Sequence, residues 1–82
     1  MTYSEVEGIV KEALAKQLTM DIAKINLDSR LVEDLGIDSF GSVEVAFELE
    51  EKFDIKIPDA ALYEAKTVKN IVDYIASVKE GK

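Results

Sequence analysis

Apolar side chains recur at three- and four-residue intervals near both ends of the chain. The first series is Val6, Ile9, Val10, Ala13, Leu14 and Leu18. The second is Val68, Ile71, Val72, Ile75 and Val78. This period places each series on one face of an α-helix. We expect a first helix that opens with a capping box of Ser4 and Glu7 and ends near residues 18–20, and a last helix that is capped by Thr67 and ends at about Val78.

The middle of the chain predicts one more long helix and one short helix. A helical pattern runs from Ser39 to about Phe53, and Pro58 marks a break before a short helix over residues 59–64. The connection over residues 21–37 is long but rich in apolar residues, so we expect it to lie against the helices, with or without a helical turn of its own. The predicted fold is all-α: a four-helix bundle with three longer helices, one short helix and a long first loop.

The central helix carries a second apolar strip beside its core face. Phe40, Val43 and Phe47 lie on an arc next to the one that holds Ala46 and Leu49. The acidic residues interleaved with this strip are Glu44, Glu48 and Glu51. Either other elements cover the strip, or it is an exposed docking face with apolar anchors inside a ring of carboxylates.

Composition limits the chemistry that the chain can perform alone. Its 82 residues suit a single small domain, residues 1–82, and contain neither cysteine nor histidine. A Ser-His-Asp or Cys-His arrangement is therefore excluded, and so is a zinc site built on these ligands. The spacing of Asp28, Glu33, Asp34 and Asp38 lacks the alternating ligands of an EF-hand, so we expect no metal site. No segment is long and apolar enough to span a bilayer, and we expect a soluble, cytoplasmic protein that is not an enzyme.

The negative charge is concentrated in the middle of the chain. Residues 28–59 contain ten acidic and three basic residues, a difference of seven that equals the net charge of −7. This field repels nucleic acid and anionic lipid, and it attracts partners that carry a basic patch. We therefore expect protein partners and neither nucleic acid nor membrane.

Ser39 follows Asp38 at the point where the loop becomes the central helix. Gly36 can adopt a positive φ to turn the chain, and Gly41 leaves space beside the serine. The segment is not the hydrolase elbow G-x-S-x-G, because Ile37 stands in place of its first glycine. Local pattern favours Ser39 as a helix cap, whereas electrostatics favours it as an attachment point, since a phosphodiester there would lie at the positive end of the helix dipole. Both interpretations remain open at this level.

The segment DLGIDSFGSVEVAFELEEKFDIKIPD strongly resembles the acyl carrier proteins, whose motif is an Asp-Ser-Leu-like triplet after DLG. LVEDLG precedes the triplet at the expected place, and TVKNIVDYI is similar to the last helix of the family. The resemblance extends over about residues 4–79 without a gap.

This resemblance implies that Ser39, next to Asp38, receives a 4′-phosphopantetheine arm from coenzyme A through a separate, magnesium-dependent phosphopantetheinyl transferase. The arm would carry acyl groups as thioesters for fatty-acid or lipid biosynthesis, and the carrier would be a monomer. Partner enzymes with basic docking patches would bind Phe40, Val43, Glu44, Phe47, Glu50 and Glu51. The acyl chain would lie near Leu49, Phe53, Ile57, Leu62, Ile71 and Tyr74.

Several positions depart from the family pattern. Phe40 replaces a leucine or methionine, Gly41 replaces a common acidic residue, and Tyr63 stands where an acid is typical. These changes remove negative charge from the docking surface and alter the cavity, but they leave Asp38 and Ser39 in place. A specialised carrier of polyketide or other acyl groups is thus an alternative, and an unmodified helical interaction domain is the alternative from a different class.

Overall fold

The chain forms helices joined by loops. The computed structural model describes the backbone of residues 2–81 and the side chains of residues 2–79. The helices are α1 (Tyr3–Leu18), the 3-10 helix η1 (Ile22–Lys24), α2 (Ser39–Phe53), α3 (Asp59–Glu64) and α4 (Val68–Gly81). No β-strand occurs within residues 2–81, and the only ladder-like pairing there is an isolated bridge between Arg30 and Thr67. The all-α bundle of three longer helices, one short helix and a long first loop is confirmed.

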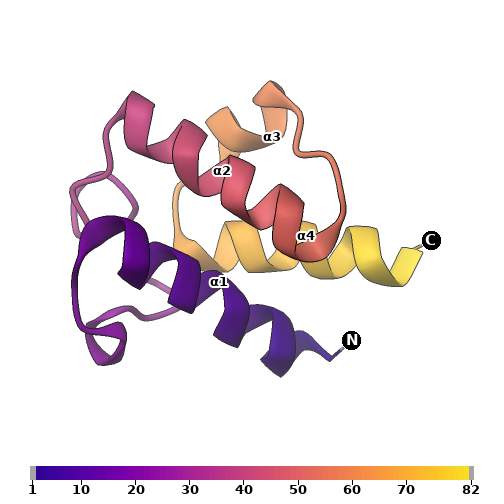
Figure 1. Ribbon diagram of the computed structural model, residues 1–82, viewed down its shortest axis with the longest axis horizontal. Helices are drawn as coiled ribbons and strands as arrows, with labels where there is room; N and C mark the ends of the chain where they lie inside the picture. The colour runs from indigo at the N-terminus through magenta and orange to yellow at the C-terminus, as the bar shows by residue number, and fades with distance from the viewer. Residues whose placement is uncertain (1, 82) are drawn as a thin grey trace.

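α1 packs against both α2 and α4, and α3 lies apart from α1 (Figure 1). The start of α1 and the end of α4 point to the same side of the view, and the first loop occupies the opposite side. The fully buried side chains come from the predicted apolar faces and from the loop. They include Val6, Val10, Leu14, Ile25, Leu49, Phe53, Val68, Val72 and Ile75. Each such side chain contributes about 1.5–3 kcal/mol when it leaves water, so these faces supply the main stabilisation of the fold.

The first loop is fastened to the helices by apolar anchors and backbone hydrogen bonds. Leu31, Leu35 and Ile37 are buried, as expected for a loop that lies against the bundle. The Leu31 N–H donates to the Lys66 carbonyl at 2.9 Å, and the Val68 and Lys69 N–H groups donate to loop carbonyls at 3.1 and 2.7 Å. Gly36 turns the loop with a φ of +72°, as its residue type predicts. The loop thus holds Asp38 in a fixed position at the start of α2.

Two helix boundaries differ from the sequence prediction. The capping box of α1 consists of Thr2 and Glu5, not Ser4 and Glu7: the Glu5 N–H donates to the Thr2 hydroxyl at 3.1 Å, and the Thr2 N–H donates to the Glu5 carboxylate at 2.8 Å. Both pairs fit the same four-residue motif, and the earlier pair starts the helix two residues sooner. α4 continues to Gly81, beyond its last apolar residue Val78.

Side chains also satisfy the start of α4 and the end of α2. The Asn70 N–H donates to the Thr67 hydroxyl at 3.2 Å, which confirms Thr67 as the cap of α4. Lys79, in the last turns of α4, donates from Nζ to the Phe53 carbonyl at the end of α2 at 2.9 Å. Because the last carbonyls of a helix lack partners within it, this bond ties the end of α2 to α4.

Tyr3 and Asp73 join the start of α1 to α4. The Tyr3 hydroxyl donates to Asp73 Oδ1 at 2.6 Å, and Lys69 Nζ lies 2.8 Å from Asp73 Oδ2. The hydrogen bond to Asp73, together with some burial and the charges of Asp73 and Glu7, raises the pKa of Tyr3 to about 12. The hydrogen bonds from Lys69 and then from Tyr3 lower the pKa of Asp73.

We expect Tyr3→Phe to lower the free energy of unfolding at pH 7 by about 0.5–1 kcal/mol, because the bond lies at the surface and is screened by water. The contribution of Tyr3 to the free energy of unfolding is fully present below its ordinary pKa of 10.0. It is lost as pH rises through the raised pKa of about 12. The Asp73 contribution is present above its ordinary pKa of 3.8 and is lost as pH falls through the lowered value. Urea unfolding of the wild type and of Tyr3→Phe at pH 7 and at pH 11 measures the difference between their free energies of unfolding. This difference should be smaller at pH 11. Tyr63→Phe is the matched control, since Tyr63 is exposed, and an equal effect of the two substitutions would contradict the assignment.

Candidate functional site

Asp38 caps the helix that carries the candidate serine. Its backbone is extended, and its Oδ1 accepts a hydrogen bond from the Gly41 N–H at 2.7 Å. Ser39 is the first residue of α2 and does not occupy the cap position. The interpretation of Ser39 as the helix cap is therefore wrong: two adjacent residues of capping type compete for one position, and the aspartate takes it.

The Ser39 hydroxyl lies at the exposed end of α2. Ser39 is exposed, and its hydroxyl makes no hydrogen bond with any part of the chain that the structure describes. Ser42, one turn later, is engaged instead: its hydroxyl donates to the carbonyls of Asp38 at 3.2 Å and of Ser39 at 3.0 Å. Of the two serines at the start of this helix, Ser39 alone presents a hydroxyl that an external reactant can approach.

Gly41 makes room for the capping carboxylate rather than for the serine. A Cβ atom at this position would lie 3.0 Å from Asp38 Oδ1 and 3.7 Å from Ile37 Cγ2. The first distance is shorter than nearly all real contacts of a Cβ atom, so a larger residue would displace Asp38 slightly. The absence of a side chain thus allows the short bond between Asp38 and the Gly41 N–H.

An apolar pocket of about 520 Å³ opens beside Ser39. Its walls come from α2, α3, α4 and the first loop, and Asp38 and Ser39 are among its lining residues. Five of the six residues that the family resemblance places near the acyl chain line this pocket. They are Leu49, Ile57, Leu62, Ile71 and Tyr74. The pocket has further lining residues that the sequence does not predict, among them Ile37, Val43, Ala46 and Ile75, because their pattern indicates core or surface positions.

Phe53, the sixth residue, does not line the pocket. It is 2% exposed and packs in the core that α2 shares with α1 and α4. It follows Leu49 by four residues, which places it about 6 Å farther along the helix and rotated by about 40°. Phe53 is thus a core residue and not one of the lining residues, and its placement beside the acyl chain stays a prediction.

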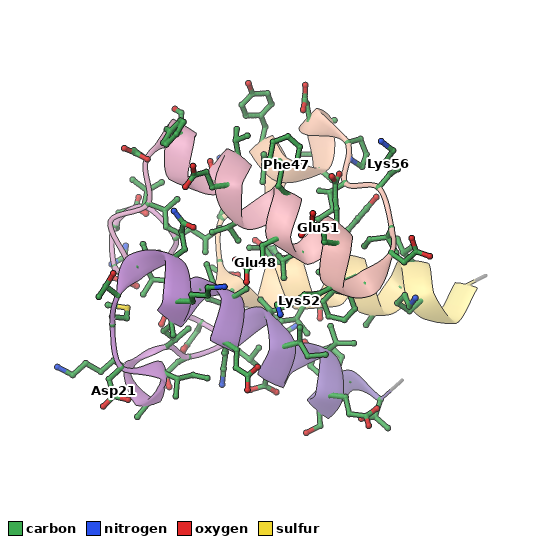
Figure 2. All side chains as sticks on the ribbon, viewed as in Figure 1. Asp21, Phe47, Glu48, Glu51, Lys52 and Lys56 are labelled. Carbon is green, nitrogen blue, oxygen red and sulfur yellow. The ribbon has the colours of Figure 1, made fainter. Side chains whose placement is uncertain are left out.

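The second apolar strip of α2 faces solvent. Phe40, Val43 and Phe47 are all exposed, so the interpretation that other elements cover the strip is wrong. Figure 2 shows the Phe47 ring projecting from α2 away from α1. The docking role of these three residues stays a prediction.

The carboxylates of the predicted docking set are mostly engaged within the molecule. Glu44 accepts a hydrogen bond from Gln17 Nε2 at 2.6 Å, and Glu50 accepts one from the Ile57 N–H at 2.7 Å. Glu48, which is outside the docking set but interleaved with the apolar strip, lies between α2 and α1 in Figure 2 and is 3.7 Å from Lys16 Nζ. Glu51 is the member of this group that is exposed.

No helix among residues 2–81 has the length and apolar character needed to cross a membrane. In the same part of the chain, no group of three or more acidic residues is arranged to hold a metal ion. The site therefore consists of one exposed hydroxyl, a capping carboxylate and an apolar pocket.

Comparison with known proteins identifies what such a site carries. A family model described as phosphopantetheine attachment site matches residues 8–75. An acyl carrier protein of Aster yellows witches'-broom phytoplasma (strain AYWB) is 47% identical over 66 residues, which are 80% of this chain and 87% of that protein. An acyl carrier protein of Helicobacter hepaticus is 44% identical over 70 residues, covering 85% of this chain and 92% of the relative. The solved structure of a candidate acyl carrier protein from Mycobacterium tuberculosis superposes with a TM-score of 0.84 at 30% identity, over 89% of this chain and 97% of the other.

Fold, site and family model define a protein that bears phosphopantetheine. With relatives of this identity and coverage, the chain belongs to the acyl carrier protein family. Its cofactor is 4′-phosphopantetheine, and proteins of this family are carriers that interact with phosphopantetheinyl transferases and acyl-handling enzymes.

Proposed function

We propose that Ser39 is the attachment point of the arm and that the protein delivers acyl groups to enzymes of fatty-acid, lipid or related acyl biosynthesis. One observation carries the proposal: the Ser39 hydroxyl is exposed, has no partner among the described residues, and borders an apolar pocket. Asp38 performs the capping, so the serine is not needed to hold the helix together.

Attachment requires the Ser39 oxygen to form a bond to the phosphorus of coenzyme A that bears the arm, while adenosine 3′,5′-bisphosphate leaves. The hydroxyl proton must go to a base of the transferase, because the chain has no histidine or cysteine and Asp38 is bonded to the Gly41 N–H. The protein thus presents the oxygen, and its partner activates it.

The start of α2 fits the phosphodiester that results. The first N–H groups of a helix lack partners within it, and the helix dipole adds partial positive charge at this end. The Gly41 N–H is taken by Asp38, which leaves those of Ser39 and Phe40 to face the new group. When bound, the arm supplies the terminal sulfur on which acyl groups are carried as thioesters, an atom that this cysteine-free chain lacks.

The pocket beside Ser39 fits an apolar cargo. Leu49, Ile57 and Ile71 give it hydrophobic walls, and Tyr74 adds an amphipathic one. Each methylene group that moves from water into such surroundings gains about 0.8 kcal/mol. We propose that an aliphatic acyl chain withdraws into this pocket between encounters with enzymes.

Incubation with coenzyme A and a broad-specificity phosphopantetheinyl transferase tests the attachment. Intact mass spectrometry should show the addition of one arm, and peptide fragmentation should place it on Ser39. A protein that folds but gains no mass would refute the carrier role and favour the unmodified interaction domain. Identification of the thioester on the protein purified from its own cells would distinguish fatty-acid cargo from polyketide or other specialised cargo.

A further inference from the structure

Five exposed apolar side chains lie on the first loop, α2 and α3, which are also elements that form the walls of the pocket. We call them the apolar face: Val32 (66% exposed), Phe40 (70%), Val43 (44%), Phe47 (64%) and Tyr63 (78%). Val32, Val43 and Tyr63 also line the pocket that borders Ser39. Exposed apolar side chains are ordinary when scattered, but a group gathered on one side of a helix, as Phe40, Val43 and Phe47 are, marks an interaction surface.

The apolar face is assembled from three segments. Phe40, Val43 and Phe47 are spaced by three and four residues, so they lie on one side of α2 over about 10 Å. Val43 of α2 and Tyr63 of α3 line the same pocket, so α3 lies beside this side of α2. Any protein that reaches Ser39 with an ordinary footprint of roughly 800 Å² must cover much of this face.

Fewer free negative charges surround the apolar face than the acidic composition of residues 28–59 suggests. Glu44 and Glu48 are directed to α1, where they meet Gln17 and Lys16. Glu51 is exposed one turn after Phe47, and the next residue, the exposed cation Lys52, lies on the side of α2 that faces α1 (Figure 2). Two carboxylates lie among the pocket-lining residues at the margins of the face: Asp59, and Asp38, whose Oδ1 accepts the Gly41 N–H.

We propose that the enzymes that use this carrier bind it mainly through an apolar depression that receives the rings of Phe47 and Tyr63, with basic side chains only at its rim. This inference rests on the proposed function, because partner enzymes would cover the apolar face only if they approach Ser39. Buried aromatic anchors supply most of the binding energy in interfaces, whereas charges at the rim mainly steer the encounter. A net charge of −7 disfavours nucleic acid and anionic membranes as occupants, and a second copy of the chain would bring like charges together.

The test uses a broad-specificity phosphopantetheinyl transferase as the probe partner and measures kcat/KM for arm transfer from coenzyme A to the full chain. Phe47→Ala and Tyr63→Ala should each lower kcat/KM roughly tenfold, the size typical of a lost aromatic anchor, chiefly by raising KM. Phe47→Leu, which keeps apolar bulk, should recover most of the rate. Glu51→Gln should lower kcat/KM by no more than about threefold and should flatten its dependence on salt.

Ile22→Ala is the matched control, since Ile22 is 41% exposed on η1, outside the apolar face, and should leave kcat/KM unchanged. Thermal melting by circular dichroism verifies that each variant is folded. Effects of Phe47→Ala and Tyr63→Ala within twofold of the wild type, or a larger effect of Glu51→Gln, would overturn the proposal. So would a wild-type dimer in sedimentation analysis that Phe47→Ala dissociates, because the face would then be a contact between copies. Failure of the wild type to accept the arm would refute the carrier role itself, which is a different result.

Discussion

Replacement of Ser39 by alanine is expected to abolish arm transfer completely. The substitution removes the one exposed hydroxyl at the start of α2, and the remaining serine there is tied to the backbone. Treatment with coenzyme A and the transferase, followed by intact mass spectrometry, should show full modification of the wild type and none of Ser39→Ala. The free energy of unfolding should change by less than about 0.5 kcal/mol, because Ser39 is exposed and Asp38 supplies the cap.

Ser42→Ala is the matched control for this result. It also deletes a serine hydroxyl in the first turns of α2, but that hydroxyl donates to the carbonyls of Asp38 and Ser39. We expect normal modification of this variant. A mass gain that persists in Ser39→Ala, or that disappears in Ser42→Ala, would contradict Ser39 as the attachment point.

Replacement of Phe53 by alanine is expected to have the largest effect on stability. The ring is 2% exposed in a core shared by three helices, and deletion of such a ring costs about 3–5 kcal/mol through lost burial and the cavity left behind. A domain of this size has a free energy of unfolding of only about 5–15 kcal/mol, and small domains lie near the lower end. Urea unfolding should therefore show a large loss of stability in Phe53→Ala, with part of the population unfolded without denaturant.

Phe47→Ala provides the comparison, because it is the same substitution on the same helix at a position 64% exposed. It should change the free energy of unfolding by less than about 0.5 kcal/mol. Similar losses in the two variants would contradict the placement of their rings. A stable Phe53→Ala protein that accommodates longer acyl chains would return Phe53 to the pocket wall.

The helices could be predicted because their evidence is local. The spacing of Val6, Val10 and Leu14 in α1 requires only the geometry of a single helix, and so does that of Val68 and Val72 in α4. The helix ends were less certain where two residues of capping type compete for the same cap position. Thr2 with Glu5 and Ser4 with Glu7 satisfy one capping motif, and the choice depends on how far the helix can extend.

Side-chain direction was the part that the sequence left undecided. Glu44 and Glu50 were expected to face a partner, but each accepts a hydrogen bond from within the molecule. The donors, Gln17 and the Ile57 N–H, are 27 and 7 residues away in the chain, so only folding brings them close. Tyr63 was noted solely as a departure from the family pattern, and its place on the rim of the pocket became evident from the packing of α3 beside α2.

The order of the helices, the concentration of acid around Ser39, and the lack of any residue that would make the serine a nucleophile unaided all follow from the amino-acid sequence. These properties depend on composition and on periods of a few residues. The packing of the segments against one another places Asp38 rather than Ser39 at the cap of α2, puts Phe53 in the core, and leaves Phe40, Phe47 and Tyr63 exposed. Each of these outcomes depends on which segments meet in space, and a helical pattern read along one segment does not contain that information.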